Sequence, residues 1–372
     1  MIIKSGPWDY DAFYKSEHPE YVAIRKMIHQ NPEHDFVLVG HGRNFEHFRF
    51  GKVLIYNLGS GNKLRYLLSL SLNFSLPLLM KPSVIVGMGG INEIPMAMAS
   101  IPTQAKFIPV IVIDLWFSLS EMPVRIRSLI KVLLKASLHE SYAALAISQS
   151  IRKELVESYN VPSEKVLVYK YKISDIFNQN VPKDLKKTLN PSGPVVLTMC
   201  RISPQKGLQY LVEASQIVSK RVPNVKFVLR AYSAEKTYKE KLLNLIKNCN
   251  VQSLFEIIEK FSSYEELPTY MAASDVFVLP SVSEGLPTVV LEAMACGVPV
   301  IGSKIGGISE VIIDEYNGLL VEPRDVQGLA DAIVRILSDQ KLRHALSQGA
   351  LATTKSEAQN EFTTLLSKSI FH

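Results

Sequence analysis

Hydrophobic positions along the chain fall into short continuous runs that alternate with longer amphipathic stretches. In the first half they predict strands at 36–39, 53–56, 83–86, 107–113 and 143–147, and helices at 63–79, 95–99, 122–140 and 151–159. Strands that are apolar along their whole length are typical of parallel sheets that helices cover on both faces. The first half therefore predicts an α/β domain.

A polar segment at 178–194, rich in proline, asparagine and lysine, interrupts this alternation, which then restarts. Strands are expected at 195–199, 225–229, 255–258, 276–279, 298–301 and 319–321, and helices at 207–220, 235–248, 265–273, 288–295 and 325–337. We expect two doubly wound α/β domains, at 1–177 and 195–345, joined by a linker at 178–194. Residues 346–372 would form a helical tail that packs back on the first domain. Ligands of such sheets bind at the carboxyl ends of the strands, so a site is expected in a cleft between two facing domains.

The composition excludes several classes of protein. The chain has 372 residues, of which 47% are hydrophobic and 20% charged, so it can bury sizeable cores and is neither disordered nor a disulfide scaffold. Cys200, Cys249 and Cys296 lie far apart and form no CxxC pair. This spacing excludes a cysteine-based zinc site and fits a reducing compartment.

Charge is unevenly distributed along the chain. Residues 1–180 carry 20 Lys and Arg against 15 Asp and Glu, whereas residues 181–372 carry 21 against 20. The first half thus favours a negatively charged partner, although the excess is too small to indicate nucleic acid. The longest apolar stretch, 64–80, is interrupted by charged and polar residues and is too short to span a bilayer. We expect a cytoplasmic protein that at most associates with the inner face of the cell membrane.

Candidate chemistry concentrates in the loop that leaves the strand expected at 276–279 and leads into a helix. Gly285 permits close approach of the backbone, Pro287 suits the start of a helix, and Thr288 opens its first turn. Free backbone N–H groups at such a helix start favour a phosphate.

Two carboxylates, Glu284 and Glu292, bracket this anion site. Acids would repel a bare phosphate, so we expect each of them to accept hydrogen bonds from hydroxyl groups. A nucleotide sugar offers both features, because sugar and ribose hydroxyls flank its diphosphate. Alternatively, Glu284 is a solvated loop residue and Glu292 is stabilised by the helix dipole.

Two cations and a glycine pair follow neighbouring strands. Arg201 and Lys206 lie five residues apart in the loop after 195–199, where both can reach one diphosphate. Lys206 also stands at a helix start, where the dipole disfavours a cation unless an anion is bound. Gly306 and Gly307 follow the strand at 298–301 and either bring the backbone close to a ligand or form a tight turn.

Together these motifs resemble glycosyltransferase family 4, the retaining nucleotide-sugar enzymes of the GT-B fold. The resemblance is strong over 195–337, and Glu284 and Glu292 match the paired glutamates of the family's E-x7-E motif. It implies that Glu284 contacts the donor sugar near its reacting carbon, whereas Arg201 and Lys206 neutralise the diphosphate leaving group. The residues it implies for donor binding, with Glu292 holding the ribose, are Glu292, Gly285, Leu286, Pro287, Thr288, Gly306 and Gly307.

The chain also departs from the family pattern. The Gly-x-Gly expected after the second strand of the second half is replaced by Ala231, Tyr232 and Ser233. A His-Asp pair that commonly ends the strand at 107–113 is reduced to Asp114.

On the acceptor side we expect Asp114 together with His41, Gly89 and Gly90, which lie in loops after two other strands. These loops are equally compatible with plain turns, and His41 with a solvated side chain.

The helix expected at 122–140 carries a basic stripe formed by Arg127, Lys131 and Lys135, beside an apolar face. This combination suits contact with an anionic membrane surface. The alternative is an ordinary helix that faces the core and has solvated lysines.

The sequence therefore predicts a metal-independent, retaining glycosyltransferase of polysaccharide or glycolipid biosynthesis that needs no cofactor. Its donor would be a nucleotide diphosphate sugar of UDP or GDP type, and its acceptor a hydroxyl group of a glycan or a lipid-linked acceptor. Side-chain cations at the leaving group make a metal ion unnecessary. The alternatives are a catalytically silent nucleotide-sugar-binding partner of another glycosyltransferase, and a nucleotide-sugar epimerase.

Overall fold

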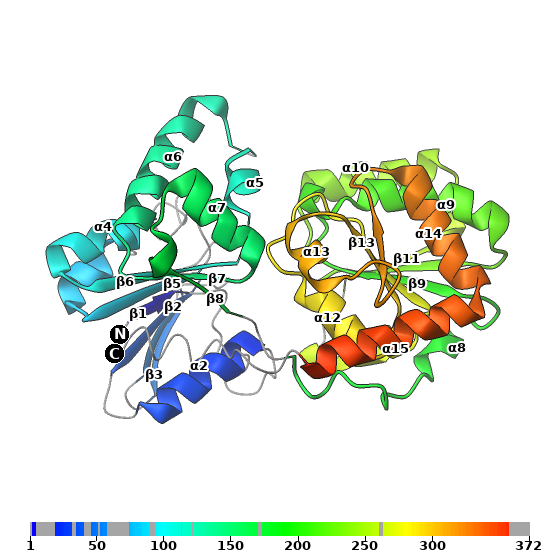
Figure 1. Ribbon diagram of the computed structural model, residues 1–372, viewed down its shortest axis with the longest axis horizontal. Coiled ribbons are helices and arrows are strands. Elements are labelled where there is room, and N and C mark those ends of the chain that lie inside the picture. Colours follow the sequence, from blue (N-terminus) through cyan, green and yellow to red (C-terminus); the bar gives the residue numbers. More distant parts are fainter. Residues whose placement is uncertain are drawn as a thin grey trace. The chain divides into compact units, whose positions relative to one another are not determined.

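In the computed structural model the chain divides into two compact units, one that extends to Tyr171 and one that begins at Lys172 (Figure 1). The structure describes residues 2–4, 19–31, 35–40, 46–50, 53–57, 74–88, 94–112, 114–120, 122–169, 173–259 and 263–356. Each unit is an α/β domain built around its own sheet.

The sheet of the first unit has the strand order β3-β4-β2-β1-β5-β6-β7-β8. Its strands pair in parallel except β3 and β4, which form an antiparallel pair at one edge. Helices α4, α6 and α7 lie on one face of this sheet and α2 lies on the other (Figure 1). The elements are β1 (Ile2–Lys4), α2 (Pro19–Gln30), β2 (Phe36–Gly40), β3 (Glu46–Phe50), β4 (Val53–Asn57), β5 (Val84–Met88), α4 (Ile94–Thr103), β6 (Lys106–Ile111), α5 (Leu115–Ser120), α6 (Val124–His139), β7 (Ala144–Ala146), α7 (Gln149–Tyr159), η2 (Ser163–Lys165) and β8 (Val166–Val168).

The sheet of the second unit is parallel throughout, in the order β11-β10-β9-β12-β13-β14. From β9 the chain builds β10 and β11 on one side and then resumes at β12 on the other, so the strand order reverses between β9 and β12. The elements are α8 (Leu185–Leu189), β9 (Val195–Met199), η3 (Pro204–Lys206), α9 (Leu208–Arg221), β10 (Lys226–Arg230), α10 (Lys236–Asn248), η4 (Gln252–Leu254), β11 (Phe255–Ile258), η5 (Tyr264–Glu266), α11 (Leu267–Ala272), β12 (Val276–Leu279), α12 (Thr288–Ala295), β13 (Val300–Ser303), α13 (Gly306–Val311), β14 (Leu319–Val321), α14 (Val326–Ser338) and α15 (Gln340–Ser356).

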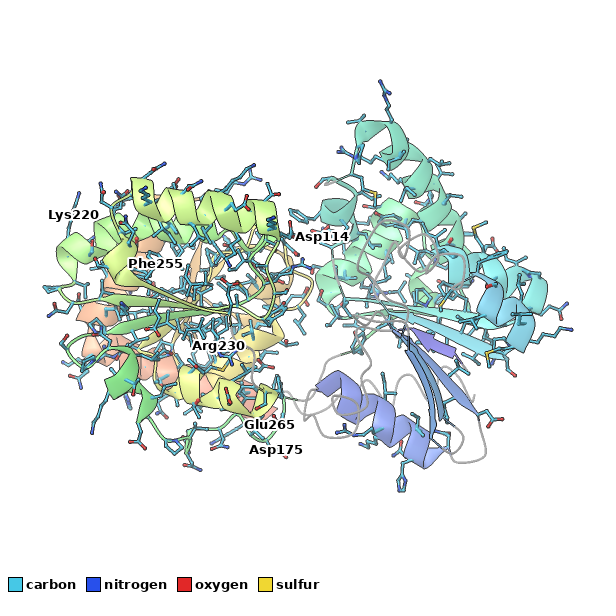
Figure 2. All side chains as sticks on the ribbon, turned by 180° about the vertical axis from the view of Figure 1, so that it is seen from behind. Asp114, Asp175, Lys220, Arg230, Phe255 and Glu265 are labelled. Atoms are coloured by element: carbon cyan, nitrogen blue, oxygen red, sulfur yellow. The ribbon has the colours of Figure 1, made fainter. Side chains whose placement is uncertain are left out.

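The core of the second unit joins this sheet to helices α9 and α14. Val196 and Val278 of the central strands pack with Leu211 of α9 and Ile333 of α14, and all four side chains are almost completely buried. Phe255 of the edge strand β11 (Figure 2) stacks on Phe227, with ring centroids 5.1 Å apart. Burial of apolar area on this scale dominates folding stability and holds the strand ends in fixed positions.

The segment at 178–194, expected to be a linker, is folded onto the second unit. Its helix α8 contributes Lys186, whose Nζ donates to Asp275 Oδ1 at 2.6 Å. Asp275 Oδ2 in turn accepts from the backbone N–H of Val195 at 2.8 Å, at the start of β9. These bonds explain why the division between units lies before residue 178.

The boundary expected at 345/346 falls inside α15. Leu346 of this helix is fully buried in the core of the second unit, and Ser347 Oγ donates to the carbonyl oxygen of Gly297 at 2.6 Å. The described part of the expected tail, up to Ser356, therefore belongs to the second unit.

Candidate functional site

The site residues of the second unit gather where β9 and β12 lie side by side. The loop at 200–207 follows β9, and the loop at 280–287 follows β12. The strand order reverses between these two strands, and a reversal of this kind marks the place where parallel α/β sheets bind ligands.

The two loops are joined by one backbone hydrogen bond and one from a side chain. Val282 N donates to Gln205 O at 2.8 Å, and Gln205 Nε2 donates to Ser283 O at 3.0 Å. Gly207 adopts a φ of 62°, and a Cβ there would collide with the carbonyl oxygen of Pro280. Only glycine combines this positive φ with the absence of a Cβ, so the close approach of the two loops requires glycine at position 207.

Lys206 and Glu284 form an ion pair between these loops. Their side chains are only 14% and 8% exposed, and Ser281 Oγ donates to the same carboxylate oxygen at 2.8 Å. Burial alone would lower the pKa of Lys206, but the charge and hydrogen bond of Glu284 outweigh it, so the pKa of Lys206 is raised. The structure thus pairs two residues that the sequence singled out separately, Lys206 for a diphosphate and Glu284 for a sugar.

Arg201 and Cys200 lie beside this pair. Arg201 is exposed, and its Nη2 donates to Gln205 Oε1 at 3.4 Å, a long bond that leaves the guanidinium available for another acceptor. Burial raises the pKa of the Cys200 thiol to about 12, so it is protonated and unreactive at neutral pH.

Glu292 lies on α12 and is 5% exposed. Tyr264 Oη donates to Glu292 Oε1 at 2.7 Å, and the ring of Phe177 packs edge-on against Tyr264 with centroids 5.4 Å apart. Burial raises the pKa of Glu292 to about 7, and the hydrogen bond from Tyr264 works in the opposite direction. Sequence reasoning missed Tyr264, because no motif marks it.

Gly306 and Gly307 are the first two residues of α13, so they begin a helix and do not form a turn. A Cβ on Gly307 would collide with the carbonyl oxygen of Gly285. The close approach expected of this glycine pair is therefore made to the loop after β12. Leu286 is buried in that loop, and Pro287 precedes α12, which begins at Thr288.

Among the acceptor-side residues expected from the sequence, the structure places Asp114 (Figure 2). Its Oδ1 accepts from the backbone N–H of Phe117 at 2.8 Å and so stabilises the start of α5. His41, Gly89 and Gly90 lie outside the described residues.

The basic stripe expected on helix 122–140 lies on α6. Lys131 and Lys135 are exposed, whereas Arg127 Nη2 donates to the carbonyl oxygens of Ser120 at 2.7 Å and Met122 at 3.0 Å. Of the apolar residues of this helix, Leu134 and Leu138 are buried, but Val124, Ile126, Leu129 and Val132 are exposed. The first half of α6 thus combines cations with uncovered apolar side chains.

Two properties of the described part of the chain concern membranes and metals. None of its helices is both long enough and apolar enough to cross a bilayer. No group of three or more His, Cys, Asp or Glu residues in that part could hold a metal ion.

Comparisons with known proteins connect this site to a family. Residues 181–352 match the family described as glycosyl transferases group 1. The chain is 27% identical over 221 residues to an alpha-D-kanosaminyltransferase of Streptomyces kanamyceticus, covering 58% of this chain and 56% of that protein. It is 28% identical over 231 residues to an N-acetyl-alpha-D-glucosaminyl L-malate synthase of Bacillus anthracis, covering 62% and 59%. The match thus spans little more than half the length of these curated relatives.

Several solved structures match over the whole length of the chain. A sucrose-phosphate synthase from Thermosynechococcus elongatus has a TM-score of 0.79 at 16% identity, covering 100% of this chain and 98% of that one. HepE of Anabaena, solved in complex with UDP and glucose, has a TM-score of 0.75 at 18% identity with the same coverage. These likenesses confirm the GT-B fold predicted from the sequence.

Proposed function

We propose that the chain, whose residues 181–352 match the glycosyl transferases group 1 family, moves a sugar from a nucleotide diphosphate sugar to a hydroxyl group of an acceptor. One observation carries this proposal. The Lys206–Glu284 pair lies in the loops at the carboxyl ends of β9 and β12, and Glu292 follows in the same strand–loop–helix segment as Glu284. A cation at this place suits a diphosphate, and the two carboxylates suit hydroxyl groups.

Lys206 and Arg201 would stabilise the leaving group. Cleavage of a sugar–diphosphate bond creates an oxocarbenium-like sugar and a diphosphate that gains negative charge. A buried ammonium group held in advance by Glu284 and an exposed guanidinium meet that charge more strongly in the transition state than in the ground state. We propose that these side chains serve in place of a metal ion and that the reaction needs no cofactor.

The carboxylates would bind the two sugars of the donor. Glu284 accepts from hydroxyls of the transferred sugar near its reacting carbon, and Glu292 accepts from the ribose. Backbone of Gly285 to Thr288, with Gly306 and Gly307 behind it, lines the space between them. That HepE was solved with UDP supports a UDP-type donor here, with GDP as the second candidate.

We further propose that transfer proceeds with retention at the reacting carbon and that the acceptor is a glycan or a lipid-linked glycan. The exposed apolar side chains and cations of α6 support contact with an anionic membrane surface, where a lipid-linked acceptor would be presented. Asp114 remains a candidate for the acceptor side, in addition to its bond at the start of α5.

A panel of sugar nucleotides tests the donor class. A ligand that binds only the folded protein raises its melting temperature by mass action. We expect a UDP-sugar or GDP-sugar to raise it and the free sugars to leave it unchanged. Proton NMR of the product formed from the active donor then reports the anomeric configuration, and the same reaction in excess EDTA tests metal independence. No stabilisation by any sugar nucleotide would contradict the proposed function.

A further inference from the structure

Tyr232 lies in a loop whose backbone is fixed against the loop that carries Arg201. Cys200 N donates to the carbonyl oxygen of Arg230, the last residue of β10 (Figure 2), at 3.2 Å. Two residues on, Ile202 N donates to Ser233 O at 2.9 Å. Bonds on both sides of Tyr232 therefore hold it next to the segment 200–202.

The side chain of Tyr232 is 59% exposed, whereas the preceding residue, Ala231, is buried. A tyrosine ring left open to water gains little from packing at this position.

The hydroxyl of Tyr232 is electrostatically coupled to the site. Desolvation is the main cause that raises the pKa of this hydroxyl. The positive charge of Lys206 lowers the pKa in part, and smaller effects come from Cys200, Arg201 and Glu284. The phenol therefore stays protonated near neutral pH and can donate a hydrogen bond.

The charges of the site indicate why a neutral hydrogen-bond donor would be useful there. Glu284 pairs with Lys206 and Arg201 contacts the neutral Gln205, so these three charged groups leave a single positive charge in excess. A nucleoside diphosphate carries more negative charge than that. A neutral O–H group adds a hydrogen bond to a phosphate oxygen without placing another cation beside Lys206.

We propose that Tyr232 contacts the donor directly, by donating its hydroxyl to the phosphate that carries the sugar. This inference rests on the proposed function and deepens it. The phosphate at the sugar end is chosen because the backbone bonds of Cys200 and Ile202 hold Tyr232 beside the loop that also carries Lys206, the partner of Glu284.

Calorimetric titration of UDP, GDP and ADP, each paired with its monophosphate, tests the assignment. Tyr232→Phe removes only the hydroxyl, and we expect it to weaken binding of the diphosphate about tenfold. Affinity for the matching monophosphate, which lacks the second phosphate, should stay unchanged. Tyr316→Phe is the matched control, because Tyr316 is 51% exposed in the same unit, and it should bind both nucleotides as the parent does.

Unchanged diphosphate affinity in Tyr232→Phe would overturn the assignment. So would a Tyr232→Ala variant that loses diphosphate and monophosphate equally while Tyr232→Phe loses neither, because that result indicates stacking of the ring on the base. If the parent bound none of the three diphosphates, the proposed function would fail and this inference with it. Binding by the parent with no effect of Tyr232→Phe would remove the inference alone.

Discussion

The hydroxyl of Tyr264 donates to the carboxylate of Glu292 at 2.7 Å, and both side chains are buried. A neutral donor compensates a buried carboxylate only in part, which is why the pKa of Glu292 rises to about 7. The end of the site proposed to hold the ribose therefore changes charge within the physiological pH range.

The stability of the protein should depend on pH through Glu292. Its pKa in the folded state lies above the ordinary value of 4.5, so folding favours the protonated form. The contribution of Glu292 is fully present below about pH 4.5 and is lost as pH rises through 7. Glu292→Gln keeps an acceptor for Tyr264 but does not titrate, so the parent should lose on the order of 3 kcal/mol relative to it between pH 5 and 8. Urea unfolding at several pH values measures this difference.

Tyr264→Phe provides the matched control for that experiment. The hydrogen bond from Tyr264 favours the ionised carboxylate, so its loss should destabilise the protein more at pH 8 than at pH 5, by about 1–2 kcal/mol. Parallel stability curves for the parent and Glu292→Gln would show that Glu292 does not titrate in this range.

The Lys206–Glu284 pair should behave as one unit in a double-mutant cycle. Lys206→Met leaves a buried carboxylate without a counter-charge and should cost about 3 kcal/mol of unfolding free energy. Lys206→Met combined with Glu284→Gln should cost less than the sum of the two single changes, because neither charge is then stranded. Additive effects of the two substitutions would contradict the pairing.

Alanine substitutions at Gly207 and Gly297 separate the cost of a positive φ from the cost of a steric collision. Both have positive φ, 62° and 73°. Gly207→Ala collides with Pro280 O, whereas at Gly297 the nearest atoms, on Ser347 and Leu351, lie 3.5 Å away. Gly297→Ala should cost about 1 kcal/mol, and Gly207→Ala should cost more and also weaken nucleotide binding. Equal losses of stability with unchanged nucleotide binding would show that the two site loops tolerate a wider separation.

Membrane contact by α6 should depend on its exposed cations. Arg127 is left in place because it holds the carbonyl oxygens of Ser120 and Met122. Arg125→Gln, Lys131→Gln and Lys135→Gln together should weaken binding to phosphatidylserine-containing vesicles about a hundredfold, at about 1 kcal/mol for each charge. Sedimentation with vesicles measures this.

The matched control for α6 neutralises three exposed lysines of the second unit, Lys220, Lys241 and Lys247. This variant has the same net charge as the α6 variant and should sediment as the parent does. Equal sedimentation of the α6 variant and the parent would rule out α6 as the membrane contact.

Much of the second unit could be predicted because its strands are continuous apolar runs. β9, β11, β12 and α12 have the predicted bounds. In the first unit, β3 was missed because its sequence, EHFRF, alternates with polar residues at an antiparallel edge. The start of α15 was missed because its first residues are mostly polar and continue directly from α14. Hydrophobic periodicity therefore identifies buried helices and strands but does not identify those at the surface.

Some relations within the site could likewise be predicted from the sequence, and others could not. Glu284 and Glu292 lie in one strand–loop–helix segment, so their relation is local and readable from spacing. The partners of these two acids are distant in sequence: Lys206 is 78 positions from Glu284 and Tyr264 is 28 from Glu292. Such pairings depend on the order of strands in the sheet, which the alternation of elements does not specify.

The affinity of the second unit's site for a nucleoside diphosphate tests the account most directly. Titration of UDP or GDP compares the nucleotide affinity of the parent with that of the Lys206→Met/Glu284→Gln double variant. In neither protein does one member of the pair stay charged without its partner. Loss of the cation should weaken binding at least about tenfold, while circular dichroism shows that the variant is folded. Equal affinity in the two proteins would contradict the claim that Lys206 and Glu284 form a donor site.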